Sequence, residues 1–307
     1  LRRGFIRGRC AGLGNRLVDG STTLMRFMDR QHRVANGIHL VGWMKGTVRK
    51  VWQKKFHELY PAKSEVDWFA DANSPEFWKR LTDPRVVSDE EIWAIRYRLR
   101  RELIEFARRR LLLQGGTFHQ GDFITFDSFL NPDALTIGFA RRFATYKRAP
   151  LIFDQFEAVV KMVKDSGHPI QFVFAGKAHP RDDHGKAFIQ KVIHLSKFSE
   201  LKGHLVFIEN YDIHVARQMV SGCDVWLNNP RRPLEASGTS GMKAALNGAL
   251  NCSILDGWWD ECFDGSNGWA INSADDDPDL GRRDAREATS LFGLLEREIV
   301  PRFYDRS

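Results

Sequence analysis

From residue 134 onward, short apolar runs alternate with amphipathic segments, and this alternation constrains the fold more than any other feature. The apolar runs are ALTIGFA (134–140), IQFVFAG (170–176), HLVFIEN (204–210), DVWLN (224–228) and NCSILDG (251–257). Helical patterns lie between them, near residues 150–165, 184–198, 213–221 and 239–250. Strands separated by helices predict an α/β fold: a Rossmann-like parallel sheet with flanking helices and right-handed crossovers.

In such a sheet, ligands bind beyond the carboxyl ends of the strands. The loops that follow four of the expected strands begin at Arg141, Lys177, Asn210 and Asn229. We therefore expect these four loops to line one crevice.

The part of the chain before the sheet divides into two segments. Residues 1–35 show no clear period and are left without an assigned fold, whereas residues 36–130 are expected to be helical and residues 131–307 to form the sheet domain.

The clearest helix runs from Ser88 to about Leu113, because Ser88 and Glu91 form a capping-box pattern. One apolar stripe follows it, formed by Ile92, Ile95, Leu99, Leu103 and Phe106. The arginines between them are predicted to form a solvated face: Arg96, Arg98, Arg100, Arg101, Arg108, Arg109 and Arg110.

Charge and cysteine content exclude several classes of protein. The formal charge is +7, but residues 1–35 hold eight arginines and two aspartates, which leaves only +1 for the remainder. A basic balance confined to one end does not support a nucleic-acid-binding fold. The four cysteines include no C-x-x-C pair, which predicts reduced thiols in a cytoplasmic protein without a metal site. No apolar run reaches the roughly 20 residues of a membrane span.

The first candidate site is EASGTSGMKAALNGAL, residues 235–250. A loop of small residues, Gly238–Gly241, opens a helix here, and the free N–H groups of a helix start favour a phosphate. Lys243 lies a few residues further on, so its amine can reach a ligand whose phosphate is held by the loop. An ordinary loop-to-helix junction with a solvated lysine is the simpler alternative, because most lysines are exposed.

The second candidate site is GFARRFATYKRA, residues 138–149, which follows the first expected strand. It places Arg141, Arg142, Lys147 and Arg148 within eight residues, and cations clustered there are suited to clamping a phosphate. A solvated basic turn is an equal alternative. Two anion sites at one edge of a sheet would hold two phosphates close together. We expect Arg148 to face away from the site and to tolerate substitution.

EASGTSGMKAALNGALNCSILDGWWDE and GFARRFATYKRAPLIF together resemble the α-glucan (glycogen or maltodextrin) phosphorylases, especially the shorter prokaryotic type. NGIH (36–39), SDEEIWAIRYRLRRELIEF, AGKAHP and FIENYD fit the same family in the same order. The resemblance runs from about residue 36 to the end of the chain. It implies the carboxyl-terminal half of a two-domain GT-B glycosyltransferase fold, with pyridoxal phosphate as cofactor, and an amino-terminal phosphorylase domain elsewhere.

The resemblance also implies roles for individual residues. Lys243 matches the lysine that forms the Schiff base with the cofactor. The cofactor phosphate is held in that family by groups that match Thr239, Ser240, Gly241 and Arg141. Tyr211 matches a tyrosine near the cofactor. Arg142 and Lys147 match residues that bind the substrate phosphate. Glu235, Ser237, Gly238, Tyr146 and Asn36 match groups that contact the glucosyl unit.

This resemblance implies phosphorolysis of an α-glucan by inorganic phosphate to glucose-1-phosphate, in which the cofactor phosphate exchanges a proton with the substrate phosphate. One rival is a sugar-nucleotide-dependent GT-B enzyme, in which a second glutamate follows the first by eight positions. Here the eighth position after Glu235 is Lys243, which favours the phosphorylase. A second rival is an inactive remnant or glucan-binding fragment, since the amino-terminal domain is missing. Two further features stay open: Trp258 and Trp259 fit a sugar platform or a buried corner, and Asp182 and Asp183 suggest a helix start.

Overall fold

Six parallel strands form one sheet at the centre of the computed structural model, which describes residues 36–305 apart from residues 73, 115–128 and 166. The strands are β1 (Leu135–Phe143), β2 (Ile170–Ala178), β3 (Leu205–Ile208), β4 (Val225–Asn228), β5 (Leu250–Ile254) and β6 (Gly268–Ile271). Their order is β3-β2-β1-β4-β5-β6, which is the order of a doubly wound Rossmann sheet. The predicted fold class is therefore confirmed. The sequence pattern located five of the strands to within a few residues and missed β6.

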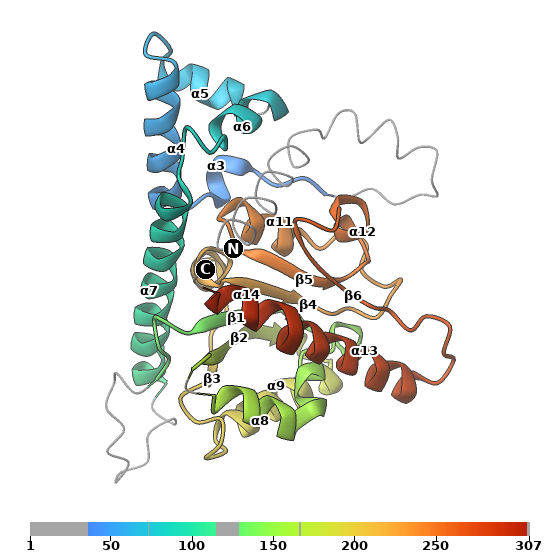
Figure 1. The fold of residues 1–307 in the computed structure, drawn as a ribbon. Coiled ribbons are helices and arrows are strands. Elements are labelled where there is room, and N and C mark those ends of the chain that lie inside the picture. Colours follow the sequence, from blue (N-terminus) through green and yellow to red (C-terminus); the bar gives the residue numbers. More distant parts are fainter. Residues whose placement is uncertain (1–35, 73, 115–128, 166, 306–307) are drawn as a thin grey trace.

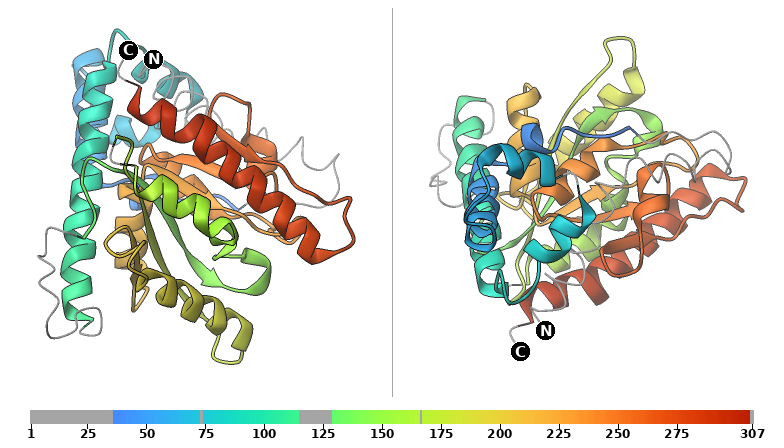
Figure 2. Two further views of the ribbon diagram at one scale, coloured as in Figure 1. Left: turned by 60° about the horizontal axis from the view of Figure 1, so that its bottom comes forward. Right: turned by 90° about the horizontal axis from the view of Figure 1, so that it is seen from above.

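Helices cover both faces of the sheet (Figures 1 and 2). One face packs against α8 (Phe156–Val163), α9 (Asp183–Ser196), α13 (Leu280–Leu294) and α14 (Val300–Tyr304). On the same face, the short helical segment η3 (Leu151–Gln155) precedes α8, and η4 (Leu295–Ile299) connects α13 to α14. The other face packs against α7 (Asp89–Leu113), α10 (Ile213–Gly222) and α11 (Thr239–Leu246). Because both faces are covered, the strands are buried almost throughout, as expected of a parallel sheet.

A smaller helical cluster packs against the first half of α7. It contains α4 (Gly46–Leu59), α5 (Glu65–Asp71) and α6 (Pro75–Leu81), and α3 (Leu40–Trp43) precedes it. Its core is aromatic, with Phe56 and Trp68 in edge-to-face contact at 5.8 Å between ring centroids. Residues 36–113 are thus mainly helical in the structure, as the sequence indicates.

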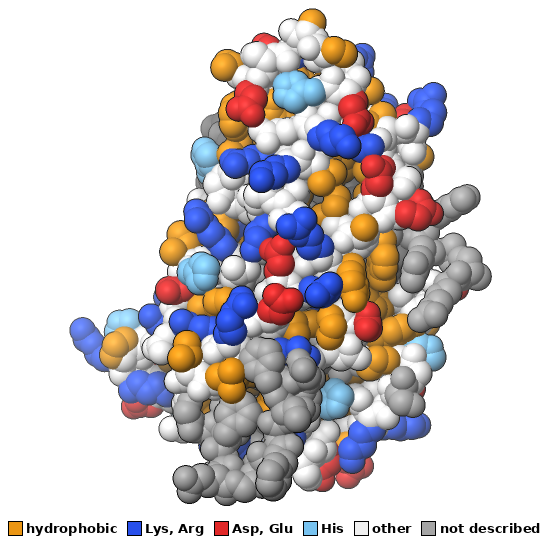
Figure 3. Space-filling view, turned by 90° about the vertical axis from the view of Figure 1, so that its left-hand side faces the viewer, with side chains coloured by type: hydrophobic (Ala, Val, Ile, Leu, Met, Phe, Trp, Pro, Cys, Tyr) orange, Lys and Arg blue, Asp and Glu red, His pale blue; other side chains and the backbone are white. Residues whose placement is uncertain are grey.

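The long helix α7 begins with the predicted capping box. The side chain of Ser88 accepts from the Glu91 N–H, and the Glu91 carboxylate accepts from the Ser88 N–H. Its stripe is confirmed as well, because Leu99 and Leu103 are fully buried. Figure 3 shows the outward face of α4 and α7, over which Lys and Arg side chains are spread. Arg98 and Arg101 belong to this exposed face, as predicted.

The prediction of a solvated face is wrong for Arg96 and Arg100, which are buried. The Arg100 guanidinium donates to an Asp224 carboxylate oxygen over 2.8 Å and to the Pro132 carbonyl over 2.6 Å. Arg96 donates to the Ser221 and Asn247 carbonyls. The Pro132 carbonyl precedes β1, and the Ser221 and Asn247 carbonyls lie at the carboxyl ends of α10 and α11, just before β4 and β5, so the two arginines fix α7 to the sheet domain. Helical periodicity places an arginine on a face but does not reveal that carbonyls of distant segments cover that face.

We predict that Arg100→Ala destabilises the fold much more than Arg101→Ala does. Removing one partner of a buried ion pair costs about 3–5 kcal/mol, whereas a surface substitution changes stability by about 0.5 kcal/mol or less. Urea unfolding of both variants measures the two free energies. Equal losses would show that the buried pair with Asp224 does not anchor α7.

Candidate functional site

The strand order reverses between β1 and β4, and the loops after these two strands meet at their carboxyl ends. Strand β1 ends at Phe143 and is followed by the turn η2 (Thr145–Lys147). After β4 comes the segment 229–238, which leads into α11. A crevice at such a reversal is the usual ligand site of a doubly wound sheet. Two of the four loops predicted to share a crevice are therefore adjacent.

A buried carboxylate joins the two loops. The Glu235 Oε2 atom accepts from Arg141 Nη2 over 2.6 Å and from Lys147 Nζ over 2.7 Å. Glu235, Arg141 and Lys147 are 6–8% exposed, so two cations and one anion share a volume with little water. The cluster therefore carries a net charge of +1 and favours a further anion.

Arg141 has more hydrogen-bonding capacity than Glu235 uses. Among the residues that the structure describes, its buried Nε and Nη1 atoms have no hydrogen-bond partner. Burial lowers the pKa of Arg141, while the adjacent Glu235 acts in the opposite direction. Burial also raises the pKa of Tyr211, and the charge of Arg141 opposes that shift. Unpaired buried donors are costly, so this arrangement fits an arginine that awaits an oxyanion.

The segment that carries Glu235 is held from three directions. The Glu235 N–H donates to Asp256 over 2.8 Å, and the Trp258 N–H donates to the Ser237 carbonyl over 2.8 Å. The Asn36 N–H donates to the Ser237 hydroxyl over 2.9 Å. Asn36 thus lies beside the loop after β4, although it precedes that loop by about 200 residues.

The start of α11 has the backbone geometry expected of a phosphate loop. Gly238 has φ +82°, a left-handed conformation that suits glycine. A Cβ atom on Gly241 would lie 2.5 Å from Asn251 Oδ1 and 2.8 Å from the Trp258 ring. The Ser240 hydroxyl accepts from the Trp226 indole over 3.3 Å. First-turn N–H groups, including those of Thr239 and Ser240, have no partner within the helix, so they are available to an anion.

Lys243 lies in the second turn of α11 and is half-buried. Its Nζ atom lies 4.0 Å from the centroid of the Trp43 ring, a cation–π contact. Burial lowers the pKa of Lys243, which increases the neutral fraction of its amine. The sequence analysis did not identify Trp43. A tryptophan seven residues after Asn36 gives no periodic signal that points to α11.

Asn247 holds Trp43 in place over the lysine. Its amide donates to the Trp43 carbonyl over 2.9 Å and accepts from the Lys45 N–H over 2.7 Å. The helical segment before the sheet therefore contributes directly to the surroundings of Lys243.

The structure separates the predicted cations into three environments. Arg141 and Lys147 are buried and share Glu235, whereas Arg142 is exposed on β1, opposite Lys177 in the register of β2. Tyr146 is half-buried, with Lys147 Nζ 4.7 Å from its ring centroid. Arg148 faces away from this cluster, as expected, but its environment argues against the expectation that it tolerates substitution. It is 3% exposed and fully engaged in ion pairs and hydrogen bonds.

The remaining open features are resolved by burial. Trp258 and Trp259 are 1% and 0% exposed, so they form a buried aromatic corner. Asp182 caps α9 by accepting from the Gly185 N–H, which confirms the predicted helix start. Within the described residues, no group of three or more His, Cys, Asp or Glu side chains is placed to hold a metal ion. The same residues include no helix that is long and apolar enough to cross a membrane.

Cys223, Cys252 and Cys262 are free thiols, and Cys10 lies outside the described residues.

Fold and site together define a doubly wound α/β domain with a buried, positively charged cluster at its switch point.

Comparison with known proteins identifies the family. Residues 125–261 match the family model described as carbohydrate phosphorylase. The chain is 40% identical over 274 residues to maltodextrin phosphorylase of Thermococcus litoralis, which covers 89% of this chain and 31% of that protein. It is 43% identical over 277 residues to glycogen phosphorylase of Mycobacterium tuberculosis, covering 89% of this chain and 30% of that protein. The corresponding values for glycogen phosphorylase of Aquifex aeolicus are 41% over 281 residues, 89% and 38%.

The chain contains a carbohydrate phosphorylase domain, and it spans about a third of the length of the curated relatives it matches. The resemblance noted from its motifs is confirmed. Its sheet is consistent with one half of a GT-B fold.

The shared counter-ion of the buried cluster yields a prediction. Glu235→Gln leaves Arg141 and Lys147 without their carboxylate, so we expect a lower melting temperature, since breaking a buried pair costs about 3–5 kcal/mol. Inorganic phosphate should replace the lost charge and raise the melting temperature of the variant more than that of the wild type. Glu157→Gln, an exposed position on α8, is the control. An equal response to phosphate in all three proteins would contradict an anion site at this cluster.

Proposed function

We propose that this chain is the cofactor-and-phosphate half of an α-glucan phosphorylase, which splits glycogen or maltodextrin with inorganic phosphate to give glucose-1-phosphate. The observation that carries the proposal is the buried cluster of Arg141, Lys147 and Glu235, whose loop leads directly into the helix that bears Lys243. The sequence similarity to maltodextrin and glycogen phosphorylases supports it.

The residues present fit pyridoxal phosphate. The cofactor has an aldehyde, which suits the half-buried amine of Lys243, and a phosphate, which suits a helix start beside a buried arginine. The structural observation that supports this match is the pair of unpartnered buried nitrogens of Arg141, Nε and Nη1. Lys243, Thr239, Ser240, Gly241 and Arg141 would hold the cofactor, with Tyr211 beside Arg141.

When bound, the cofactor would supply a phosphate that titrates near pH ~6 and so exchanges a proton with a second phosphate at neutral pH. Arg142 and Lys147 would bind that second, substrate phosphate and reduce the repulsion between the two anions. Glu235, Ser237, Gly238, Tyr146 and Asn36 would orient the glucosyl unit. In this arrangement the Glu235 carboxylate leaves the cations when phosphate binds them, and it then accepts from sugar hydroxyls.

The chain alone is expected to show almost no turnover. Catalysis depends on holding both substrates together, and an amino-terminal phosphorylase domain would supply the glucan site. A cytoplasmic location and possible homo-oligomers belong to the same proposal by family resemblance. The alternative of a sugar-nucleotide-dependent enzyme is disfavoured, because Lys243 occupies the position where such enzymes have their second glutamate. An inactive remnant is the alternative that the two tests below address.

The first test concerns the lysine. Pyridoxal phosphate followed by borohydride should leave a stable adduct on Lys243, found by peptide mapping and absent in Lys243→Ala. Because burial lowers the pKa of Lys243, its neutral amine persists at lower pH than that of exposed lysines. The midpoint of its labelling curve should therefore lie at lower pH than that of Lys63, which is exposed and whose pKa is raised by its hydrogen bond to Asp71. Labelling spread equally over both lysines would count against the cofactor site.

The second test concerns the substrate phosphate and uses a polypeptide with the full length of the relatives. Arg142→Ala should lower phosphorolysis roughly ten- to a hundredfold with cofactor content unchanged, since a charge-assisted bond contributes about 1.5–3 kcal/mol. Arg142→Lys should restore activity only in part, because a point charge cannot replace a bidentate fork. Arg98→Ala, exposed on α7, is the control. Full activity in Arg142→Ala would place the substrate phosphate elsewhere.

A further inference from the structure

Arg148 follows Lys147 directly and has an unusual environment for a surface-turn arginine. Its side chain is 3% exposed, and its backbone adopts φ 46° and ψ 47°. A left-handed conformation is unfavourable for a residue with a side chain, and it persists only where the surroundings hold it in place. The contacts of this one residue therefore determine how the turn after β1 ends.

Arg148 and its neighbours join the turn after β1 to the loop after β4. The Arg148 guanidinium donates from Nε to the Asn229 carbonyl over 3.0 Å and from Nη2 to the Pro230 carbonyl over 2.9 Å. In return, the Asn229 amide donates to the Arg148 carbonyl over 2.9 Å. The Arg231 N–H donates to the Tyr146 carbonyl over 2.7 Å. Four hydrogen bonds thus connect the loop that carries Lys147 with the loop that carries Glu235.

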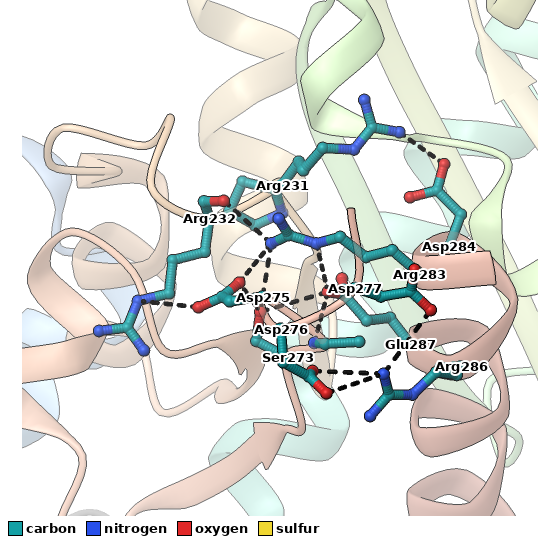
Figure 4. Close-up of polar contacts among 12 residues, drawn as sticks. Arg231, Arg232, Ser273, Asp275, Asp276, Asp277, Arg283, Asp284, Arg286 and Glu287 are labelled. Carbon is teal, nitrogen blue, oxygen red and sulfur yellow. Dashed lines mark hydrogen bonds and ion pairs between the residues drawn. The ribbon is translucent and has the colours of Figure 1, made fainter. Parts of the chain in front are cut away.

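Helix α13 completes the connection from outside the site. Arg148 Nη1 lies 2.8 Å from Asp284 Oδ1, and Nη2 lies 2.5 Å from Glu287 Oε2. Glu287 is fully buried, and Asp284 also pairs with Arg231 over 2.6 Å. Figure 4 shows the surrounding ion pairs, in which Arg283 binds Glu287 and the Arg232 carbonyl.

Charge balance separates this network from the anion site. Arg148, Arg231 and Arg283 are offset by Asp284, Glu287 and Asp275, so the network is close to neutral. The cluster around Glu235 has an excess positive charge instead. A phosphate is therefore attracted to Lys147 and Arg141, and the neighbouring arginine is not free to join them.

We propose that Arg148, held by Glu287 and Asp284 of α13, is a positioning residue that sets the spacing between Lys147 and Glu235. It contacts neither side chain and acts through the two loops. When its guanidinium is absent, the carbonyls of Asn229 and Pro230 lose their donor, and the loop after β4 no longer has a fixed distance from the turn after β1. Lys147 is then no longer held beside Arg141, so the two cations converge less well on a phosphate and Lys147 becomes more accessible. The phosphate role rests on the proposed function, whereas the geometry does not.

The experiment uses the 307-residue chain and two readouts. Calorimetry measures the affinity for inorganic phosphate, and brief reductive methylation with mass spectrometry measures the accessibility of Lys147. Arg148→Met keeps the apolar stem without the charge, Glu287→Gln weakens the hold on Arg148, and Arg148→Lys keeps the charge. Arg286→Met is the control, because Arg286 lies on the same helix but is half-exposed and pairs with Asp276.

Arg148→Met should weaken phosphate binding and increase Lys147 methylation, each by roughly tenfold, as expected when charge-assisted hydrogen bonds are lost. Glu287→Gln should give a smaller change in the same direction, Arg148→Lys a partial recovery, and Arg286→Met no change. A merely structural role would lower the melting temperature while the folded protein kept wild-type Lys147 reactivity and phosphate affinity, and that result would overturn the proposal.

Two further outcomes are decided in advance. If Arg148→Met does not fold, Glu287→Gln takes its place, and wild-type values in that variant overturn the proposal. If Lys243 of the wild type does not form an adduct with pyridoxal phosphate, the proposed function fails. The methylation of Lys147 still tests the positioning role, because it requires no ligand.

Discussion

The junction between β1 and β4 depends on buried charges at both of its ends. Only Ile137 with Val225 and Gly138 with Trp226 pair in register between these strands, so the strands themselves provide little contact. At the amino end, Asp224 joins the two strands through both its backbone and its side chain. Its N–H donates to the Thr136 carbonyl, and its carboxylate accepts from the Thr136 N–H and from Arg100. At the carboxyl end, Arg148 binds the carbonyls that follow β4. The candidate ligand site thus lies at a seam between two strands that buried ion pairs hold together.

Burial of ions is costly unless each ion is paired and hydrogen-bonded. The two arginines at the ends of the seam meet this condition, because Arg100 and Arg148 each bind a carboxylate and at least one carbonyl. Arg141 does not, since two of its nitrogens have no partner among the described residues. The contrast separates the two structural arginines from Arg141, a candidate for binding a ligand, although all three are buried. An arginine that is buried but incompletely bonded retains donors for an oxyanion, and the surrounding packing bears the cost.

Much of the fold follows from the sequence because the strands are buried on both faces and therefore appear as continuous apolar runs. Strand β6, Gly268–Ile271, was missed because its glycine and alanine leave no continuous run of large apolar residues. Helix α13 was missed for a different reason, because its sequence is polar. Arg283 and Glu287 form buried ion pairs there, and periodicity cannot distinguish such pairs from a solvated face. The same limit explains why the burial of Arg96, Arg100 and Arg148 was not foreseen. Local patterns give the face on which a charge lies, but the partner that covers it comes from a distant segment.

The candidate site could be predicted as a set of residues but not as an arrangement. Motif resemblance pointed to Glu235, Arg141 and Lys147 individually, and their convergence on one carboxylate oxygen appears only in the structure. Trp43 gave no signal, since its contact with Lys243 spans 200 positions of sequence and depends on Asn247.

The different burial of Arg141 and Arg142 suits the two phosphates of the proposed reaction. Alternate residues of a strand point to opposite faces, and here one arginine is buried beside Glu235 while the next is exposed opposite Lys177. A cofactor phosphate that stays bound through many turnovers benefits from a desolvated partner, because electrostatic attraction is stronger where water is excluded. A substrate phosphate must enter and leave in every cycle, and an exposed cation binds it without a large desolvation cost. Two dianions also need more positive charge than the buried cluster provides, so the exposed cations at the strand ends would supply the remainder. On the proposed function, the depth of each arginine therefore matches how long its phosphate stays.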